Sequence, residues 1–180
     1  MKKEITTPLT ENIVKSLTAG DEVLISGTIY TARDAAHKRL SHLIAENKEL
    51  PVNLDGQIVY YTGPTPAQPG KVIGSAGPTT SGRMDRYTPD LITYSGLRGI
   101  IGKSNRSPEV IKAFKDHGCV YFVAIGGAGA LLSKCITSSE IVCYEDLGAE
   151  AIYKLTVNSF PVIVAIDCSG NNLYERISPR

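Results

Sequence analysis

The chain has 180 residues, of which 42% are hydrophobic and 21% charged, as expected for a globular protein with a substantial core. Its formal net charge is +1, so no general attraction to nucleic acid or to a membrane surface is expected, and any anion binding has to be local. No apolar run approaches the roughly 20 residues of a membrane span. The N-terminal lysines also precede no apolar stretch of the kind that a secretory signal requires. These features predict one domain over residues 1–180, located in the cytoplasm.

The first half of the chain is predicted to be rich in strands and loops. Residues 1–20 are expected to form a polar lead-in with a weakly amphipathic piece at 13–17. The apolar, β-branched segment 23–30 predicts a strand, and apolar residues at helical spacing predict a helix from about Asp34. Two short strands joined by a proline-rich loop are predicted next, the strands at 58–61 and 71–76 and the loop at 62–70.

The clearest helix signal in the sequence lies at residues 108–117. Ser107 is a favourable N-cap, Pro108 suits the first helical position, and Gly118 provides a C-terminal stop. The continuous apolar run 119–125 follows, which is typical of a strand covered on both faces.

The remaining segments alternate between strand and helix. Helices are predicted at 90–97, 128–135 and 149–156, strands at 141–144 and 162–167, and a closing hairpin at 169–174. The fold class expected from this alternation is α/β, as a single mixed domain.

The cysteines and histidines show no metal-site pattern. None of the four cysteines stands in a C-x-x-C pair, and the three histidines lack the spacing of zinc ligands. We therefore expect reduced, mostly buried thiols, and no metal or cofactor bound by this chain alone.

Two glycine-rich turns, 77–85 and 96–104, carry the strongest functional signal. Each holds a cation, Arg83 or Lys103, and the first adds the hydroxyl run Thr79-Thr80-Ser81. Glycine allows the backbone to approach a ligand closely, arginine binds a carboxylate with two prongs, and lysine adds a compact charge. These turns predict a pocket for a small, multiply charged anion. The alternative for the hydroxyls is that they cap turns by bonding to nearby backbone.

Two further residues bear on this pocket. Arg33 precedes a predicted helix N-terminus, where backbone N–H groups favour anions, and it is a candidate ligand. His37, one helical turn later, is expected to be a surface or capping residue. Arg83 has an alternative interpretation as the partner of Asp85 in a structural ion pair.

Three other motifs fail as known functional patterns. A P-loop ending at Gly102-Lys103-Ser104 needs glycine at position 97, which is leucine, so the match fails by one position. A dinucleotide motif over 127–132 fails because residue 132 is leucine, which leaves close backbone packing for the glycines at 126–129. Glu145-Asp146 is expected to be a solvated acidic turn.

Taken together, several segments resemble the iron–sulfur hydro-lyase family. They are Gly27-Thr28 and residues 32–37, 61–64, 77–85, 99–104 and 124–130. The chain most resembles the β subunit of class I fumarate hydratase, which is equivalent to the C-terminal domain of the single-chain enzymes, and the β subunit of L-tartrate dehydratase is similar. The resemblance spans residues 10–175.

The resemblance implies a swivelling β/β/α domain and a division of labour between two chains. The partner would be an α subunit whose three cysteines hold a [4Fe–4S] cluster with one open iron, and the active site would lie between the subunits. Arg33, Arg83 and Lys103 would bind the carboxylates of a dicarboxylate substrate, and Thr79 would take the proton from carbon 3 of malate.

The activity implied in this way is the reversible hydration of fumarate to (S)-malate. Dehydration of tartrate by the same machinery is the nearest alternative. A non-catalytic module that binds small anions is an alternative of a different class.

Overall fold

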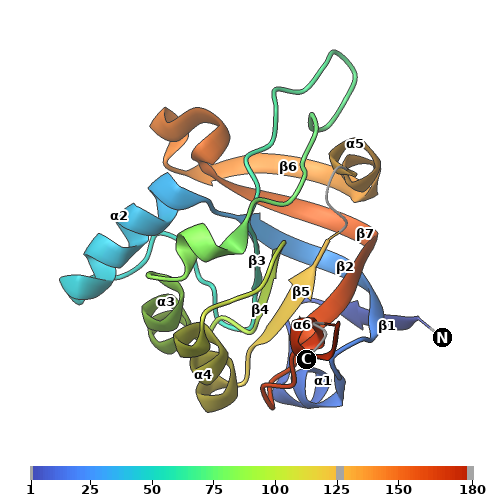
Figure 1. The fold of residues 1–180 in the computed structure, drawn as a ribbon. Helices are drawn as coiled ribbons and strands as arrows, with labels where there is room; N and C mark the ends of the chain where they lie inside the picture. The colour runs from blue at the N-terminus through green and yellow to red at the C-terminus, as the bar shows by residue number, and fades with distance from the viewer. Residues whose placement is uncertain (1, 125–127, 178–180) are drawn as a thin grey trace.

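Seven strands form one sheet within residues 2–124 and 128–177, which the computed structural model describes. They are β1 Lys3–Thr6, β2 Glu22–Thr31, β3 Ile58–Tyr60, β4 Gly99–Gly102, β5 Val120–Val123, β6 Ile136–Cys143 and β7 Ile152–Ile166. Their order is β1-β2-β3-β4-β5-β7-β6 (Figure 1). Strands β2 to β5 run parallel, and β7 pairs antiparallel with both β5 and β2. The sheet therefore closes on itself through β7, while β1 and β6 are added to β2 and β7.

The three longest helices cover one flank of this closed sheet. The α-helices are α1 Glu11–Ser16, α2 Asp34–Ala45, α3 Thr88–Ser95, α4 Pro108–His117, α5 Gly129–Leu132 and α6 Leu173–Ile177, and the 3-10 turns are η1 Ser81–Met84, η2 Ser133–Cys135 and η3 Glu145–Glu150. Figure 1 shows α2, α3 and α4 together on the same flank. The mixed α/β class expected from the sequence is confirmed. Among the described residues, no helix has both the length and the apolar character needed to cross a membrane.

Alternate strand residues supply two separate hydrophobic clusters. Along β4, Ile100 packs with side chains of α2, α3 and α4, whereas Ile101 belongs to a second cluster with residues of β2 and β7. Tyr121 and Phe122 divide in the same way along β5. Since successive strand residues point to opposite faces, one apolar run can serve both clusters. The expectation of a strand covered on both faces is confirmed.

The helix α4 forms where its local signals predict it. Ser107 Oγ accepts a hydrogen bond from Val110 N at 3.4 Å, which caps the first turn. Gly118 ends the helix with φ +66°, a conformation that favours glycine. The structure likewise confirms the predictions of β2, α2, β3, α3, the α5–η2 turn and the strands within β6 and β7.

The helix predicted at 149–156 is wrong. The turn η3 ends at Glu150, and β7 begins at Ile152. Residues 154–157 of β7 pair with β2 on one side and with β6 on the other. Pairing on both edges decides the conformation here, because backbone groups in a sheet interior need partners on each side.

Three smaller expectations are also corrected. Residues 71–76 form no strand: Thr65 N donates to Ser75 O and Gly74 N donates to Thr65 O, so residues 74 and 75 bond within their own loop. The lead-in contains the strand β1, which was not predicted, and the helix α1 at the place of the amphipathic piece. After the turn around Asp167 the tail forms α6 instead of a hairpin strand, although a single bridge joins Ile166 and Asn172.

All four cysteine thiols are free. Cys119 is buried, whereas Cys135, Cys143 and Cys168 are partly exposed. The expectation that the thiols are mostly buried is therefore wrong for three of them. Cys143 packs at the margin of the cluster between the sheet and helices α2 to α4, and Cys135 and Cys168 at the margin of the other cluster.

Candidate functional site

The four predicted site residues lie at one edge of the sheet, where the parallel strands end. Arg33 follows the end of β2, and Lys103 follows the end of β4. Thr79 reaches the same edge through a hydrogen bond with Tyr61, the residue after β3. Ligands in such sheets bind outside the carboxyl ends of the parallel strands, so the topology places these residues where a site is expected.

Backbone hydrogen bonds hold the hydroxyl run beside Lys103. Thr79 N donates to Tyr61 O at 2.7 Å, and Ser81 N donates to Lys103 O at 3.0 Å. Thr80 and Lys103 form a parallel bridge. The 77–85 loop therefore runs next to the chain that leaves β4, and Thr79 and Lys103 lie in adjacent segments.

The three hydroxyls of this run divide into two kinds. Ser81 is buried, and its hydroxyl bonds to the Tyr121 hydroxyl at 2.7 Å, so it ties the loop to β5. Within residues 2–124 and 128–177, the hydroxyls of Thr79 and Thr80 bond to no other group. The structural interpretation of the run thus applies to Ser81, and among the described residues it does not account for the threonine hydroxyls.

The two arginines meet at Asp34. Arg83 Nε donates to Asp34 Oδ1 at 3.0 Å, and Arg33 Nε lies 4.0 Å from Asp34 Oδ2. The partner of Arg83 is thus Asp34 and not Asp85, which corrects the alternative considered from the sequence. The Arg83 side chain is 55% exposed and that of Arg33 is 26% exposed, so both retain contact with solvent.

Asp34 was not identified as part of the site from the sequence. Its only local signal is that it directly follows Arg33 at the start of a predicted helix. The carboxylate occupies one side of the Arg83 guanidinium through Nε, which leaves the terminal nitrogens of Arg83 for a ligand.

Gly63 makes room for Arg33. A Cβ at position 63 would lie 2.8 Å from Arg33 Nη1 and 3.2 Å from Ala149 O. Any larger residue would therefore push the guanidinium out of its present position. The glycine of the 61–64 segment serves a close approach between side chain and backbone.

His37 is buried beneath this arrangement, which contradicts the expectation of a surface residue. It is 1% exposed, and its ring meets the Tyr61 ring edge-on at 5.2 Å between centroids. Its Nδ1 lies 2.8 Å from Arg33 O, and because a carbonyl can only accept, Nδ1 carries the proton. Burial lowers the pKa of His37 to about 4, so the ring is neutral near pH 7.

The low pKa of His37 gives the stability of the fold a specific pH dependence. Between pH 6.5 and 4 an unfolded chain with an ordinary histidine pKa binds more protons than the folded chain. The contribution of His37 is therefore complete above pH 6.5 and is lost as the pH falls through this range. We expect the loss of this contribution to lower the free energy of unfolding by about 2 kcal/mol between pH 7.5 and pH 5.

Urea unfolding of wild type and His37→Gln at both pH values checks this expectation. Carboxylates that titrate in a similar pH range affect the free energy of unfolding of wild type and variant equally. The difference between the two proteins therefore reports the contribution of His37 alone. His42→Gln, on an exposed part of the same helix, is the control and should keep the wild-type pH dependence. If the free energy of unfolding fell equally in wild type and His37→Gln between the two pH values, the low pKa of His37 would be contradicted.

The other sequence motifs lie outside the site or have structural partners. Glu145 and Asp146 are both exposed, as expected for a solvated acidic turn. Asp146 also pairs with Arg39 of α2 at 2.8 Å and 2.5 Å. Gly126 and Gly127 lie outside the described residues. Gly129 does pack closely: its O accepts from Ala76 N, and a Cβ there would lie 2.8 Å from Gly77 N.

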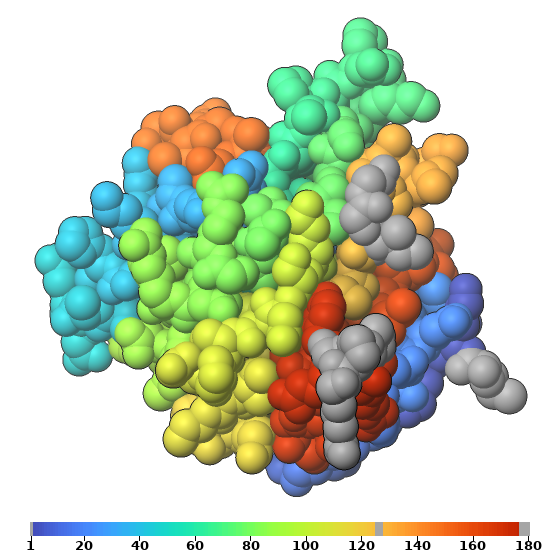
Figure 2. Space-filling model, viewed as in Figure 1, coloured from blue at the N-terminus to red at the C-terminus, as the bar shows by residue number. Residues whose placement is uncertain are grey.

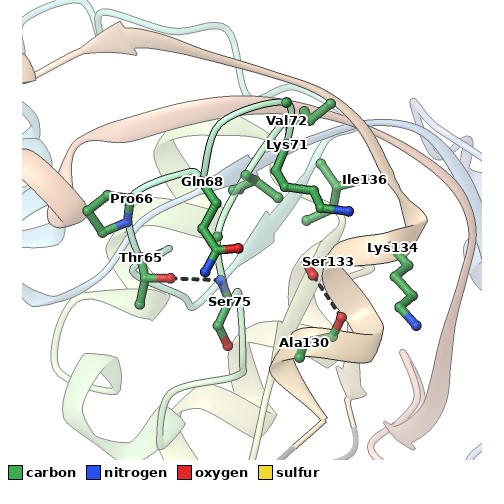
Figure 3. Close-up of a pocket in the computed structure, with 13 residues that line it drawn as sticks. Thr65, Pro66, Gln68, Lys71, Val72, Ser75, Ala130, Ser133, Lys134 and Ile136 are labelled. Carbon is green, nitrogen blue, oxygen red and sulfur yellow. Dashed lines mark hydrogen bonds between the residues drawn. The ribbon is translucent and has the colours of Figure 1, made fainter.

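A cavity of about 610 Å³ opens next to this edge, between the projecting 65–75 loop and the α5–η2 turn (Figure 3). Figure 2 shows the loop standing out from the body of the protein. Lys71 and Lys134 line the cavity from opposite sides, whereas none of the four predicted site residues does. The candidate site is therefore a surface arrangement of side chains at the strand ends, separate from this cavity.

Known proteins match this chain along nearly its whole length. The family described as Fumarase C-terminus matches residues 2–177. A putative L(+)-tartrate dehydratase subunit beta of Methanocaldococcus jannaschii is 39% identical over 177 residues, covering 96% of this chain and 91% of that protein. The anaerobic class I fumarate hydratase of Escherichia coli is 41% identical over 154 residues, covering 85% of this chain but 28% of that protein. A putative class I fumarate hydratase of Geobacillus stearothermophilus is 39% identical over 174 residues, covering 94% of this chain and 33% of that protein.

Proposed function

Because the chain belongs to the family of the fumarase C-terminus, we propose that it is the β subunit of a fumarate hydratase. In this proposal it hydrates fumarate reversibly to (S)-malate, and only together with a cluster-bearing α subunit. One observation of the structure supports a dicarboxylate site most directly. Arg33, Arg83 and Lys103 come from three different segments to one sheet edge, which the segment carrying Thr79 also reaches.

The charge at this edge suits a dianion. Arg33, Arg83 and Lys103 together with the carboxylate of Asp34 carry two net positive charges, which match the two carboxylates of malate or fumarate. Arginine binds carboxylates in a two-pronged geometry, and Asp34 leaves the terminal nitrogens of Arg83 available for it.

The same cations would stabilise charge that develops during the reaction. Loss of the proton from carbon 3 of malate leaves a carbanion that delocalises into the neighbouring carboxylate, and arginine and lysine on that carboxylate stabilise the added charge. Thr79 is the proposed base. A neutral hydroxyl is a poor base, so the cations beside it have to lower the free energy of its alkoxide.

The cluster is assigned to the partner. Among the described residues, no group of three or more His, Cys, Asp or Glu side chains could hold a metal ion, so these residues do not fit a [4Fe–4S] cluster. When bound on the α subunit, the open iron would supply a Lewis acid for the leaving hydroxyl.

Thr79→Ala is expected to lower kcat for (S)-malate by about 100-fold or more, because a positioned proton-transfer group contributes at least that much. Thr79→Ser keeps a hydroxyl and should retain much more activity than Thr79→Ala. Steady-state kinetics of the reconstituted complex measures both. Thr80→Ala, on the next residue of the same run, is the control and should stay within a few-fold of wild type. Equal activity of Thr79→Ala and Thr80→Ala would remove Thr79 from the proton transfer.

Tartrate dehydration is the second candidate function. It is favoured by the relative named as tartrate dehydratase subunit beta, which this chain covers over 91% of its length. Anaerobic reconstitution with the α subunit and iron, followed by rates with malate, fumarate and tartrate, separates the two. We expect higher kcat/KM for malate and fumarate, and a preference for tartrate would assign the chain to the second function.

A binding module without chemistry would behave differently in isolation. Such a module should bind dicarboxylates tightly by itself, whereas half of a shared site should bind them weakly or not at all. Titration calorimetry of the isolated chain with malate and fumarate distinguishes these cases. Micromolar binding by the chain alone, with no turnover in the complex, would support the module.

A further inference from the structure

We propose that Arg106, buried beneath the candidate site, is a positioning residue that fixes the segments carrying Thr79, Arg83 and Lys103. The roles of those three residues rest on the proposed function, whereas the contacts of Arg106 do not. Its side chain is 0% exposed, and no motif of the sequence points to it. Its importance follows only from what it contacts.

The first contact joins the 77–85 loop to the start of α4. Arg106 Nε donates to Asp85 Oδ1 at 2.7 Å, and the other oxygen of Asp85 accepts from Ser107 N at 2.7 Å. Asp85 N in turn donates to Gly82 O, next to Arg83. The carboxylate therefore fixes the turn from which Arg83 projects.

The second contact reaches Thr79 through Tyr61. Arg106 Nη2 donates to Tyr61 Oη at 3.2 Å and to Thr88 Oγ1 at 2.9 Å. The backbone carbonyl of Tyr61 accepts from Thr79 N, so Arg106 holds the ring of the residue whose backbone holds Thr79. Thr88 Oγ1 also bonds to Met84 O, which ties the end of the same loop to the same guanidinium.

Aromatic rings connect Arg106 to the segments that hold Lys103 and Arg33. The guanidinium carbon lies 5.3 Å from the ring centroid of Tyr61 and 5.0 Å from that of Tyr121. Tyr121 Oη donates to Ser104 O at 2.8 Å, next to Lys103. The ring of His37 packs on Tyr61, and its Nδ1 bonds to the carbonyl of Arg33.

A purely structural role would not require this charge. Replacing a buried ion pair by apolar residues of similar volume is often neutral or stabilising, so filling the space is no reason to bury an arginine. What the guanidinium offers is a rigid planar fork with donors in fixed directions, here toward Asp85, Tyr61 and Thr88. Fixed directions matter most for a site in which misplacement by about 1 Å can cost about 100-fold in rate.

The test is Arg106→Lys, which keeps the charge but cannot supply the fork. We expect kcat/KM of the reconstituted complex to fall by at least about tenfold. We also expect the amide hydrogens of Thr79 and Ser81 to exchange at least about tenfold faster in the isolated chain, while amides of β2 and β7 keep their protection. Arg39→Lys is the matched control, since Arg39 also pairs with a carboxylate and lies over a tyrosine ring, but on an exposed helix face. It should leave both readouts unchanged.

A second variant covers the case in which Arg106→Lys does not fold. Tyr61→Phe removes only the hydroxyl that accepts from Nη2, and it should move both readouts in the same direction by a smaller factor. Loss of global stability with unchanged kcat/KM and unchanged exchange at Thr79 and Ser81, in whichever variant folds, would overturn the proposal. If the wild-type complex shows no turnover, the proposed function fails, and the exchange measurement still decides whether Arg106 positions the loops.

Discussion

Arg83→Ala is expected to lower kcat/KM of the reconstituted enzyme by about 100- to 1,000-fold while the subunits still associate. Truncating one partner of a desolvated charge pair costs about 2–5 kcal/mol, or about 30- to 5,000-fold, and the expected range lies in the middle of this interval. The loss should be large because Arg83 would contact the carboxylate on which charge develops. Steady-state kinetics with (S)-malate measures the effect, and gel filtration of the complex reports association.

Two features of the structure make this variant informative. The pair of Arg83 with Asp34 is half-exposed, so its loss should change the free energy of unfolding by about 1 kcal/mol or less. Arg86→Ala is the matched control: this exposed arginine lies in the same loop region, over the Tyr87 ring at 4.5 Å, and away from Asp34. If Arg83→Ala kept kcat/KM within about threefold of the Arg86→Ala value, Arg83 would not bind the substrate carboxylate.

Asp85→Asn is expected to lower the free energy of unfolding by about 3 kcal/mol or more, the largest effect on stability that we predict. The substitution keeps the shape of the side chain but leaves the Arg106 guanidinium buried without its carboxylate. An uncompensated buried charge is strongly destabilising, whereas an exposed one is not. Urea unfolding of the isolated chain at neutral pH measures the difference.

An exposed ion pair provides the control for this prediction. Asp116 pairs with Lys112 one turn away on α4, and both side chains are largely exposed. Asp116→Asn should therefore cost about 0.5 kcal/mol or less. If Asp85→Asn and Asp116→Asn lowered the free energy of unfolding by similar amounts, the pair of Asp85 with Arg106 would not stabilise the connection between the 77–85 loop and α4.

The elements that the sequence predicted correctly are those with local determinants. Helix α4 is an example, since its N-cap, its first-turn proline and its terminal glycine all lie within its own span. One segment whose conformation depends on distant partners was predicted wrongly. The start of β7 was predicted as a helix because its pairing with β2 and β6 comes from segments that the local pattern does not contain.

The candidate site divides in the same way. Thr79, Arg83 and Lys103 lie in glycine-rich turns that the sequence singled out, and Arg33 precedes a predicted helix N-terminus. The roles of all four stay predictions. Their supporting partners could not be predicted, because they are remote in sequence. Asp34 lies 49 residues from Arg83, and Tyr61 lies 45 residues from Arg106.

In the proposed function, this chain supplies the cationic half of a site that a second chain completes. The most direct measurement is a titration of this chain into a fixed amount of the iron-loaded α subunit under anaerobic conditions, with the initial rate of fumarate formation from (S)-malate as readout. We predict negligible rates for either chain alone and a rate that rises until the two chains are present in equal amounts. Turnover by one chain alone, or no turnover of malate, fumarate or tartrate at any ratio, would contradict the claim.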